Sequence, residues 1–371
     1  MKLPLVSIVI GTRPEAIKLC PLILAFQRSE SFKVRVILTG QHEDMVAKIM
    51  SLFGVIEDIN LNILNKGQDL IDINCAVMVG LRKEFKKYFP DLLIVQGDTS
   101  SAYSSALTAF YYKIPIAHVE AGLRTNNLYD PFPEESNRRL ISQLASLHFV
   151  PTNLAKINLH QSGIKKNVFL TGNTVIDALN SISRLEKKDE KLYENISCLD
   201  NLIFVTVHRR ENWGGNIFKI TKGIKFILDK HKDVNFLIAL HPNQDIRDIF
   251  YKNFDGENRV IMTDPLDYDQ LILILKKSKF VLTDSGGLQE EAPSLGKPVL
   301  ILRETTERPE VIEAGTAKLI GTNPESIYKH CNLLLTSKEN YDSMAKAINP
   351  FGDGTACEKI LKICKDYFYK I

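Results

Sequence analysis

The sequence predicts an α/β protein with two doubly wound, Rossmann-like domains that face a central cleft. Short apolar, β-branched runs alternate with longer helical patterns, and this alternation occurs twice along the 371 residues. The apolar runs are continuous, which is typical of parallel strands covered by helices on both faces. Polar residues follow the predicted strands directly, where open α/β sheets bind their ligands.

Each half of the chain contains six predicted strands. Those of the first half are Val6–Ile10, Val34–Thr39, Leu92–Gln96, Pro115–Val119, Leu147–Val150 and Val168–Thr171. Helical patterns between them include Ile17–Arg28, Asp44–Phe53, Leu70–Tyr88, Ser100–Tyr111 and Ser136–Leu144. The strands of the second half are Ile203–Val207, Asn235–Leu240, Val260–Met262, Phe280–Thr283, Val299–Leu302 and Lys318–Ile320, and its helical patterns include Ile217–His231 and Tyr268–Lys277.

The predicted domain junction lies at residues 177–183, just before the charged stretch from Arg184 to Glu194. This stretch has the least capacity to form a core, and its alternative interpretation is a long solvated helix face. The first domain is therefore expected at residues 1–176 and the second from residue 177. A chain of this length can give each domain its own core.

Composition excludes several classes of function. A net charge of +3 is too small to favour nucleic acid or an anionic membrane as a partner. None of the six cysteines forms a C-x-x-C pair, so neither a zinc site nor a disulfide framework is expected. No apolar stretch reaches the roughly 20 residues that span a bilayer, and Leu3 to Ile10 runs into Gly11 without a signal-peptide cleavage site. We expect a cytoplasmic protein with reduced thiols.

The segment Asp284 to Glu291 predicts an anion site. It follows a buried strand and reads Asp-Ser-Gly-Gly-Leu-Gln-Glu-Glu, the pattern of a strand that turns into a helix. Backbone N–H groups at Ser285, Gly286 and Gly287, together with the positive helix end, suit a phosphate. Glu291 lies about one turn further on, where an acidic side chain can reach ribose hydroxyls. The alternative interpretation is an ordinary strand-to-helix turn.

Other strand ends carry charged and titratable residues. They place Arg13, Lys18, Asp98, Glu120 and His208 beyond predicted strands in both halves. Singly, each has a structural explanation, such as a helix cap, a surface lysine or a satisfied histidine. Together with Arg209 and Arg308, they predict a cationic cleft with carboxylates opposite. Such a cleft suits a substrate with a diphosphate and a group that exchanges a proton.

These motifs resemble the non-hydrolysing UDP-N-acetylglucosamine 2-epimerase family. The matching blocks run in family order over nearly the whole chain: Gly11 to Lys18, Gly40 to His42, Gln96 to Thr99, His118 to Thr125, Pro133 to Arg138, Thr171 to Thr174, His208 to Asn212, Asp284 to Gly296 and Thr305 to Glu310. The resemblance implies a glycosyltransferase-B architecture, a homodimer, and a C-terminal helix at residues 356–371 that crosses back to the first domain. The second domain would then span residues 177–355.

The resemblance also implies a reaction. UDP-N-acetylglucosamine and UDP-N-acetylmannosamine would be interconverted by elimination of UDP to 2-acetamidoglucal and re-addition of UDP, feeding surface polysaccharide synthesis. Neither a metal nor an organic cofactor is implied; UDP-N-acetylglucosamine and UDP are the implied ligands. The implied catalytic residues are Asp98, Glu120, Glu134, His208 and Lys18. Arg13, Ser285, Gly286, Gly287, Glu291 and Arg308 would bind the substrate.

A second, activating nucleotide-sugar site occurs in many bacterial members. Gln41, His42, Arg210 and His241 match its pattern, whereas Asp44 and Gly67 depart from it. The residues leave three other functions open. These are a hydrolysing epimerase that releases N-acetylmannosamine, a nucleotide-sugar glycosyltransferase and a non-catalytic sensor. Glu120 and Glu134 also have a structural alternative, an ion pair with Arg124 or Arg138.

Overall fold

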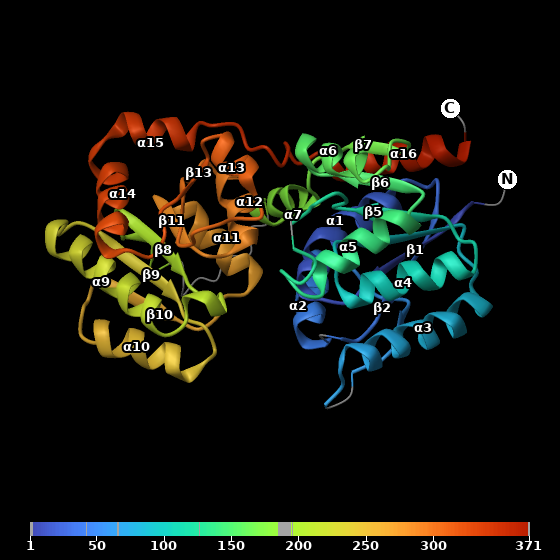
Figure 1. Ribbon diagram of the computed structural model, residues 1–371, viewed down its shortest axis with the longest axis horizontal. Helices are drawn as coiled ribbons and strands as arrows, with labels where there is room; N and C mark the ends of the chain where they lie inside the picture. The colour runs from blue at the N-terminus through green and yellow to red at the C-terminus, as the bar shows by residue number, and fades with distance from the viewer. Residues whose placement is uncertain are drawn as a thin grey trace. The chain divides into compact units, whose positions relative to one another are not determined.

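The computed structural model describes residues 3–41, 43–64, 67–125, 127–184, 194 and 196–369. The chain divides into two compact units, one formed by residues 1–182 and 351–371 and the other by residues 183–350. Each contains one parallel sheet with helices on both faces, as predicted (Figure 1). Most of the charged stretch 184–194 lies outside the described residues.

The first unit contains a seven-stranded parallel sheet. Its strands, in spatial order, are β3 (Ile59–Asn60), β2 (Lys33–Leu38), β1 (Leu5–Ile10), β4 (Leu92–Gln96), β5 (Ile116–Val119), β6 (Leu147–Val150) and β7 (Val168–Leu170). Its helices are α1 (Arg13–Arg28), α2 (Glu43–Phe53), α3 (Leu70–Lys87), α4 (Ser100–Tyr111), α5 (Glu134–Leu144), α6 (Asn153–Gln161), α7 (Thr174–Ser183) and α16 (Ala356–Tyr369). The order reverses between β1 and β4, so the ends of these strands form a topological switch point.

Helices cover the faces of this sheet and bury its apolar side chains. One face packs on apolar side chains of the neighbouring helices α3, α4 and α5, including Val77, Leu81, Ala106 and Ile141. Helices α2 and α16 both pack on α1. The strands carry apolar residues at consecutive positions because both faces are covered, and Ile8, Val9 and Ile10 are all at most 2% exposed.

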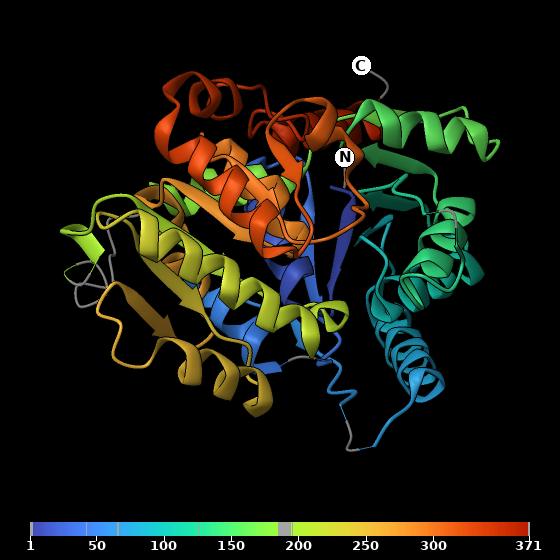
Figure 2. The same cartoon turned by 60° about the vertical axis from the view of Figure 1, so that its left-hand side comes forward.

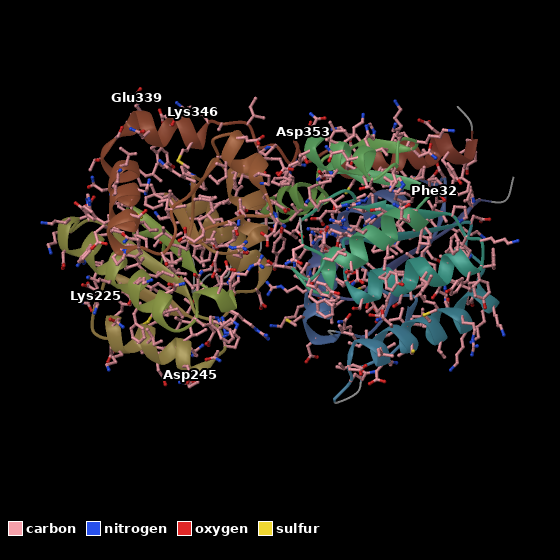
Figure 3. All side chains as sticks on the ribbon, viewed as in Figure 1. Phe32, Lys225, Asp245, Glu339, Lys346 and Asp353 are labelled. Atoms are coloured by element: carbon pink, nitrogen blue, oxygen red, sulfur yellow. The ribbon has the colours of Figure 1, made fainter. Side chains whose placement is uncertain are left out.

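The C-terminal helix α16 belongs to the first unit. Near its C-terminal end it packs on Phe32, which is labelled in Figure 3; the ring centroids of Phe32 and Phe368 are 5.8 Å apart. The hydroxyl of Tyr369 donates to the carbonyl of Ser31 over 2.8 Å. At the other end of α16, the buried Asp177 carboxylate on α7 accepts hydrogen bonds from the backbone N–H groups of Ala356 and Cys357.

The boundary between the units lies between Ile182 and Ser183, at the end of the segment 177–183 that was predicted as the junction. The first unit is therefore longer than the predicted residues 1–176. Helix α7 is anchored in the first unit through buried Val175, Leu179 and Ile182, so the first unit extends to Ile182. The chain returns at Phe351, whose carbonyl accepts from the N–H of Asn173 over 2.8 Å. It therefore rejoins the first unit five residues before the start of α16.

The second unit contains a six-stranded parallel sheet. Its strands, in spatial order, are β10 (Val260–Thr263), β9 (Asn235–Ala239), β8 (Leu202–Thr206), β11 (Phe280–Thr283), β12 (Val299–Ile301) and β13 (Ala317–Leu319). Its helices are α9 (Gly215–Lys230), α10 (Gln244–Phe254), α11 (Tyr268–Lys277), α12 (Gly286–Ser294), α13 (Pro309–Glu313), α14 (Pro324–Thr336) and α15 (Lys338–Ala345), with a short 3₁₀ turn at Arg210–Asn212.

Helices α9, α10 and α14 share one buried core with the second sheet. Figure 2 shows α9 running along the strands of this sheet. Helix α9 presents Ile217, Ile220, Ile224 and Ile227 to that core, which is the spacing of one helix face. The order reverses between β8 and β11, so the residues that follow these two strands lie at the second switch point.

Candidate functional site

The first group of site residues follows β4 and β5, which are neighbours in the sheet. Glu120 directly follows β5 and has a positive φ of 62°, a conformation that L-residues rarely adopt. Both of its carboxylate oxygens accept from Lys18 Nζ, over 2.7 and 2.5 Å. Gln96 and Asn173 also donate to it. Glu120 is thus paired with Lys18, rather than with Arg124 or Arg138.

Asp98, in the loop after β4, has a different environment. Both Nε and Nη2 of Arg138 donate to its Oδ2 atom, over 3.0 and 2.5 Å, whereas no described residue donates to Oδ1. Burial raises the pKa of Asp98; the charge of Arg138 opposes this shift and that of Glu120 adds to it. One oxygen of Asp98 is therefore fixed and the other remains available for proton exchange.

Glu134 is the first residue of α5 and is half-buried. Among the residues that the structure describes, none makes a hydrogen bond or ion pair with its carboxylate. Its neighbour Glu135 has the structural role, since this fully buried carboxylate pairs with Arg138 over 3.1 Å and with Arg139 over 2.6 Å. The structure therefore places Glu135, and not Glu134, in an ion pair with Arg138.

Glu15 was not predicted as a site residue, although it lies in the Gly11 to Lys18 block. Its carboxylate accepts from the N–H groups of Gly11 and Thr12 over 3.1 and 2.6 Å, at the start of α1. It also accepts from the hydroxyl of Thr99, next to Asp98, over 2.9 Å. Burial raises the pKa of Glu15 to about 7, against the effect of these hydrogen bonds. Only a capping pattern in the sequence points to this residue.

In the second unit, Asp284 organises the loop after β8. Its fully buried carboxylate accepts from the N–H groups of His208 and Arg209, over 3.0 and 2.9 Å, and from the Asn212 amide over 2.9 Å. Burial lowers the pKa of His208, while the charge of Asp284 opposes this effect. Asp284 was recognised only as part of a motif; its role as the anchor of the His208 loop is shown by the structure.

The N-terminus of α12 forms the predicted anion site. Ser285 is its N-cap residue, and no described residue bonds to the Ser285 hydroxyl. Arg308 lies against this end: a Cβ atom on Gly286 would be 2.5 Å from Nη1 of Arg308. Glu290, on the same helix, pairs with Arg308 and holds it there. A guanidinium and a helix N-terminus thus converge, as phosphate binding requires.

An ion-pair network extends from this site. Glu307 pairs with Arg209 over 3.3 Å and with Arg303 over 2.7 Å. Although burial alone raises the pKa of Glu307, the charges of Arg209, Arg303 and Arg308 lower it to about 2. Glu211 also pairs with Arg303, over 2.6 Å. Glu307 is therefore ionised at neutral pH and holds the basic groups of this region in place.

The remaining predicted site residues lie in different parts of the fold. Arg13 is the first residue of α1, and Glu291 is buried on α12. Arg210 lies 6.0 Å from the ring centroid of Trp213, and the His241 ring is 5.4 Å from that ring. Gln41 belongs to the first unit, where it accepts from the Ser101 hydroxyl over 2.8 Å. His42 lies outside the described residues.

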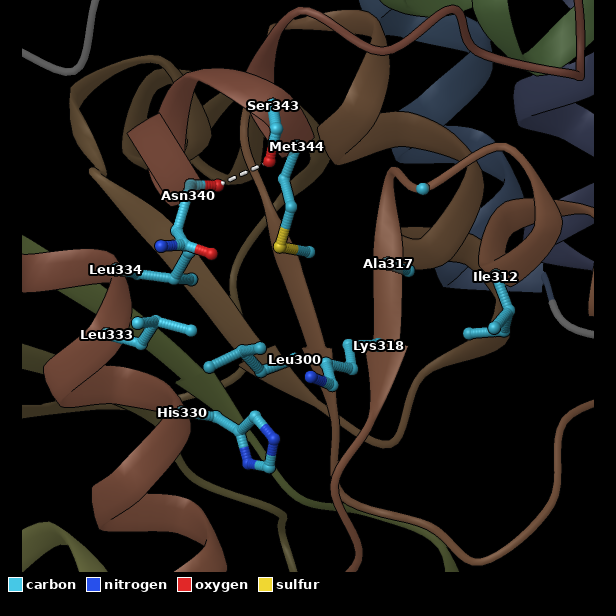
Figure 4. A pocket seen from close by; sticks show the side chains of 11 residues that line it. Leu300, Ile312, Ala317, Lys318, His330, Leu333, Leu334, Asn340, Ser343 and Met344 are labelled. Atoms are coloured by element: carbon cyan, nitrogen blue, oxygen red, sulfur yellow. Dashed lines mark hydrogen bonds between the residues drawn. The ribbon is translucent and has the colours of Figure 1, made fainter. Parts of the chain in front are cut away.

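Two cavities among the described residues lie away from the predicted site residues. A cavity of about 340 Å³ in the second unit lies between β13, α14 and α15, with His330, Lys318 and Met344 in its lining (Figure 4). A second, of about 410 Å³, lies beside α2 in the first unit. No predicted site residue lines either one. Within the described ranges, no group of three or more metal-ligating side chains was found, and no helix is long and apolar enough to cross a membrane.

Comparison with known proteins gives consistent matches over the whole chain. The sequence model of the UDP-N-acetylglucosamine 2-epimerase family matches residues 24–365. The UDP-N-acetylglucosamine 2-epimerase of Yersinia pestis is 42% identical over 367 residues, which cover 97% of this chain and 98% of that protein. The enzyme of that name from Escherichia coli K12 is 41% identical over 366 residues, covering 96% and 97%.

Solved structures agree with these relatives. The UDP-GlcNAc 2-epimerase of Neisseria meningitidis, bound to UDP-GlcNAc, superposes with a TM-score of 0.90 at 40% identity, covering 97% of this chain and 99% of that one. The complex of S. aureus MnaA with UDP gives a TM-score of 0.89 at 39% identity, covering 100% and 98%.

Proposed function

Because this chain belongs to the UDP-N-acetylglucosamine 2-epimerase family, we propose that it interconverts UDP-N-acetylglucosamine and UDP-N-acetylmannosamine. The hydrogen at C2 of the sugar is weakly acidic, and no adjacent carbonyl can stabilise a carbanion. Elimination avoids this difficulty: a base removes the C2 proton while the C1–O bond breaks and UDP leaves. UDP then adds back to the 2-acetamidoglucal with a proton delivered to the opposite face of C2.

The observation that carries this proposal is the environment of the Asp98 carboxyl group in the loop after β4. Asp98 has one oxygen fixed by Arg138, an oxygen without a described donor, and a raised pKa. A carboxyl group with a raised pKa and an available oxygen is suited to proton transfer. We assign proton transfer to Asp98 and to Glu134, whose carboxylate also lacks a described partner. Lys18 and Glu120 would set the electrostatics beside them.

The second unit supplies what a departing diphosphate needs. The helix N-terminus at Ser285, Gly286 and Gly287, together with Arg308, would stabilise the charge that develops on UDP. His208, neutral at physiological pH because burial lowers its pKa, would donate a hydrogen bond to the leaving group. Arg13 would add a further positive charge, and Glu291 would bind the ribose.

We propose the non-hydrolysing form of the reaction. The Gly11 to Lys18 and Thr305 to Glu310 blocks support it, since these segments match that branch of the family. A hydrolysing epimerase would release free N-acetylmannosamine and UDP. A sensor would need none of the proton-transfer groups, and no feature suggests a glycosyltransferase acceptor site. The manno product would serve as a precursor for surface polysaccharide.

We also propose a homodimer. The neighbouring helices α3, α4 and α5 carry exposed apolar side chains, including Ile71 at 70% and Tyr111 at 65% exposure. Covering such side chains in a subunit interface would remove apolar surface from water. Light scattering of the purified protein measures this directly, and a monomeric mass would contradict it.

Proton NMR in deuterated water tests the proposed reaction. The purified protein, given UDP-N-acetylglucosamine without added NAD or metal, should produce both UDP-sugars with deuterium at C2. Asp98→Asn and Glu134→Gln should each lower turnover by about 10²- to 10⁴-fold, with UDP affinity nearly unchanged. Glu358→Gln, which changes an exposed carboxylate on α16, is the matched control. Free N-acetylmannosamine as the main product would favour the hydrolysing enzyme, and no sugar product would favour the sensor.

A further inference from the structure

His118 is a fully buried titratable residue to which the proposed chemistry gives no role. It lies in β5, two residues before Glu120. Its Nε2 atom is 2.7 Å from the carbonyl oxygen of Gly97. Because a carbonyl only accepts, Nε2 must carry the proton in this hydrogen bond. Burial lowers the pKa of His118 to about 3, so the imidazole is neutral throughout the physiological range.

The other ring nitrogen shows that this histidine is not an ordinary core residue. Nδ1 of His118 is buried and has no hydrogen-bond partner among the described residues. The neighbouring strand places His148 opposite it in the sheet register, and burial lowers the pKa of that histidine as well, to about 4. A buried nitrogen without a partner is unfavourable. A leucine would avoid that cost, so the Nε2–H donor is what distinguishes histidine at this position.

The accepting carbonyl belongs to the loop that carries Asp98. Gly97 has a φ of 69°, and no atom lies within 4 Å of the position that a Cβ would occupy. Glycine is therefore favoured here by the backbone conformation and not by a lack of space. Three other side chains hold the next two residues. Asn137 donates to the carbonyl of Asp98 over 2.8 Å, Arg138 binds its carboxylate, and the Thr99 hydroxyl donates to Glu15. His118 supplies the only described side-chain bond to Gly97.

We propose that His118 is a positioning residue for the acid/base loop: its Nε2–H fixes the Gly97 carbonyl and so directs the available oxygen of Asp98 toward the substrate. This inference rests on the proposed epimerase function. Strand β5 would then have two roles: it positions Glu120, which follows it, and it holds the Gly97 carbonyl through His118. The loop from Gly97 to Thr99 is thereby held from three directions: β5 holds Gly97 through His118, α5 holds Asp98 through Arg138, and α1 holds Thr99 through Glu15.

Two substitutions separate this role from packing. His118→Gln places an amide nitrogen near the position of Nε2 and keeps the donor, whereas His118→Leu fills a similar volume without it. Small displacements of a reacting group reduce turnover strongly. We therefore expect His118→Leu to lower kcat by about 10- to 100-fold while KM for UDP-N-acetylglucosamine changes by less than about 3-fold, and His118→Gln to remain within about 3-fold of the parent in both.

Rates are compared per folded molecule, with the folded fraction of each variant determined by circular dichroism. Parent-like kcat in His118→Leu would overturn the proposal, because the histidine would then act only in packing. Equal loss in both variants would also overturn it, since the imidazole itself would then be required.

A second measurement does not depend on activity. Hydrogen exchange of the peptide that contains Gly97–Thr99 should become faster in His118→Leu and stay near the parent rate in His118→Gln. If the parent protein failed to epimerise UDP-N-acetylglucosamine while this exchange pattern appeared, the proposed reaction would be wrong but the positioning of the loop would stand. Unchanged exchange in His118→Leu would refute the positioning role whatever reaction the protein catalyses.

Discussion

Replacing Gly286 by alanine should disable the anion site without removing any of its charged groups. The new Cβ atom would lie 2.5 Å from Nη1 and 3.0 Å from Cζ of Arg308, well inside van der Waals contact. Arg308 cannot swing away freely, because Glu290 binds its Nε atom. The substitution must therefore move the guanidinium away from the N-terminus of α12 or distort the first turn of that helix.

The expected magnitude follows from the lost contact. A hydrogen bond between a guanidinium and a phosphate contributes roughly 1.5–3 kcal/mol, which corresponds to about a 10- to 160-fold increase in the Kd for UDP. Isothermal titration calorimetry with UDP measures this change. Intrinsic helix propensity does not oppose the substitution, since alanine is favoured over glycine in helix interiors by about 1 kcal/mol.

Gly287→Ala is the matched control, because it makes the same chemical change one residue later in the same turn. The nearest atom to a Cβ on Gly287 is Oε2 of Glu291 at 3.6 Å, an ordinary contact. If Arg308 is what requires glycine at position 286, only Gly286→Ala should lose affinity strongly. Equal losses in the two variants would refute this reasoning and indicate that the ligand itself approaches both glycines closely.

Two further predictions concern buried carboxylates. Glu15 has a folded-state pKa of about 7 against 4.5 when unfolded, so its contribution to stability is fully present below pH 4.5 and is lost as the pH rises through 7. Between pH 4.5 and 8, urea denaturation should show the parent losing on the order of 3 kcal/mol more than Glu15→Gln, and parallel curves for the two proteins would contradict this assignment. Asp284→Asn removes the charge that raises the pKa of His208, so an NMR titration should find that pKa lower than in the parent; an unchanged value would show that Asp284 acts only through its hydrogen bonds.

The positions of the main site residues could be predicted because they depend on chain order alone. Parallel strands place their carboxyl ends at one edge of a sheet, so Asp98, Glu120 and His208 were expected near ligands once the strands were identified. The N-terminus of α12 followed from Ser-Gly-Gly after a buried strand. The two-unit α/β fold predicted from the repeated strand–helix alternation is confirmed by both sheets.

The hydrogen-bond and ion-pair partners of these residues could not be predicted. Each pairing depends on the direction in which side chains from distant segments of the chain point. The residue at which α5 begins decides which side chains share a face of this helix, and so whether Glu134 or Glu135 pairs with Arg138. An irregular loop precedes α5, so its starting residue could not be predicted. Arg138 reaches Asp98 across 40 positions of sequence. The hydrogen bond from His118 to Gly97 also gives no sequence signal, since a histidine inside an apolar strand has many explanations.

The division of the chain has a consequence for its synthesis on the ribosome. Residues 183–350 form the second unit and emerge before α16, which completes the first unit. Until Ala356 and Cys357 have been translated, the carboxylate of Asp177 lacks the two backbone N–H groups that it accepts in the finished protein. The second unit is therefore fully translated before the first unit has received its final helix. A premature stop codon near residue 350 would leave the first unit incomplete, although most of that unit is synthesised earlier.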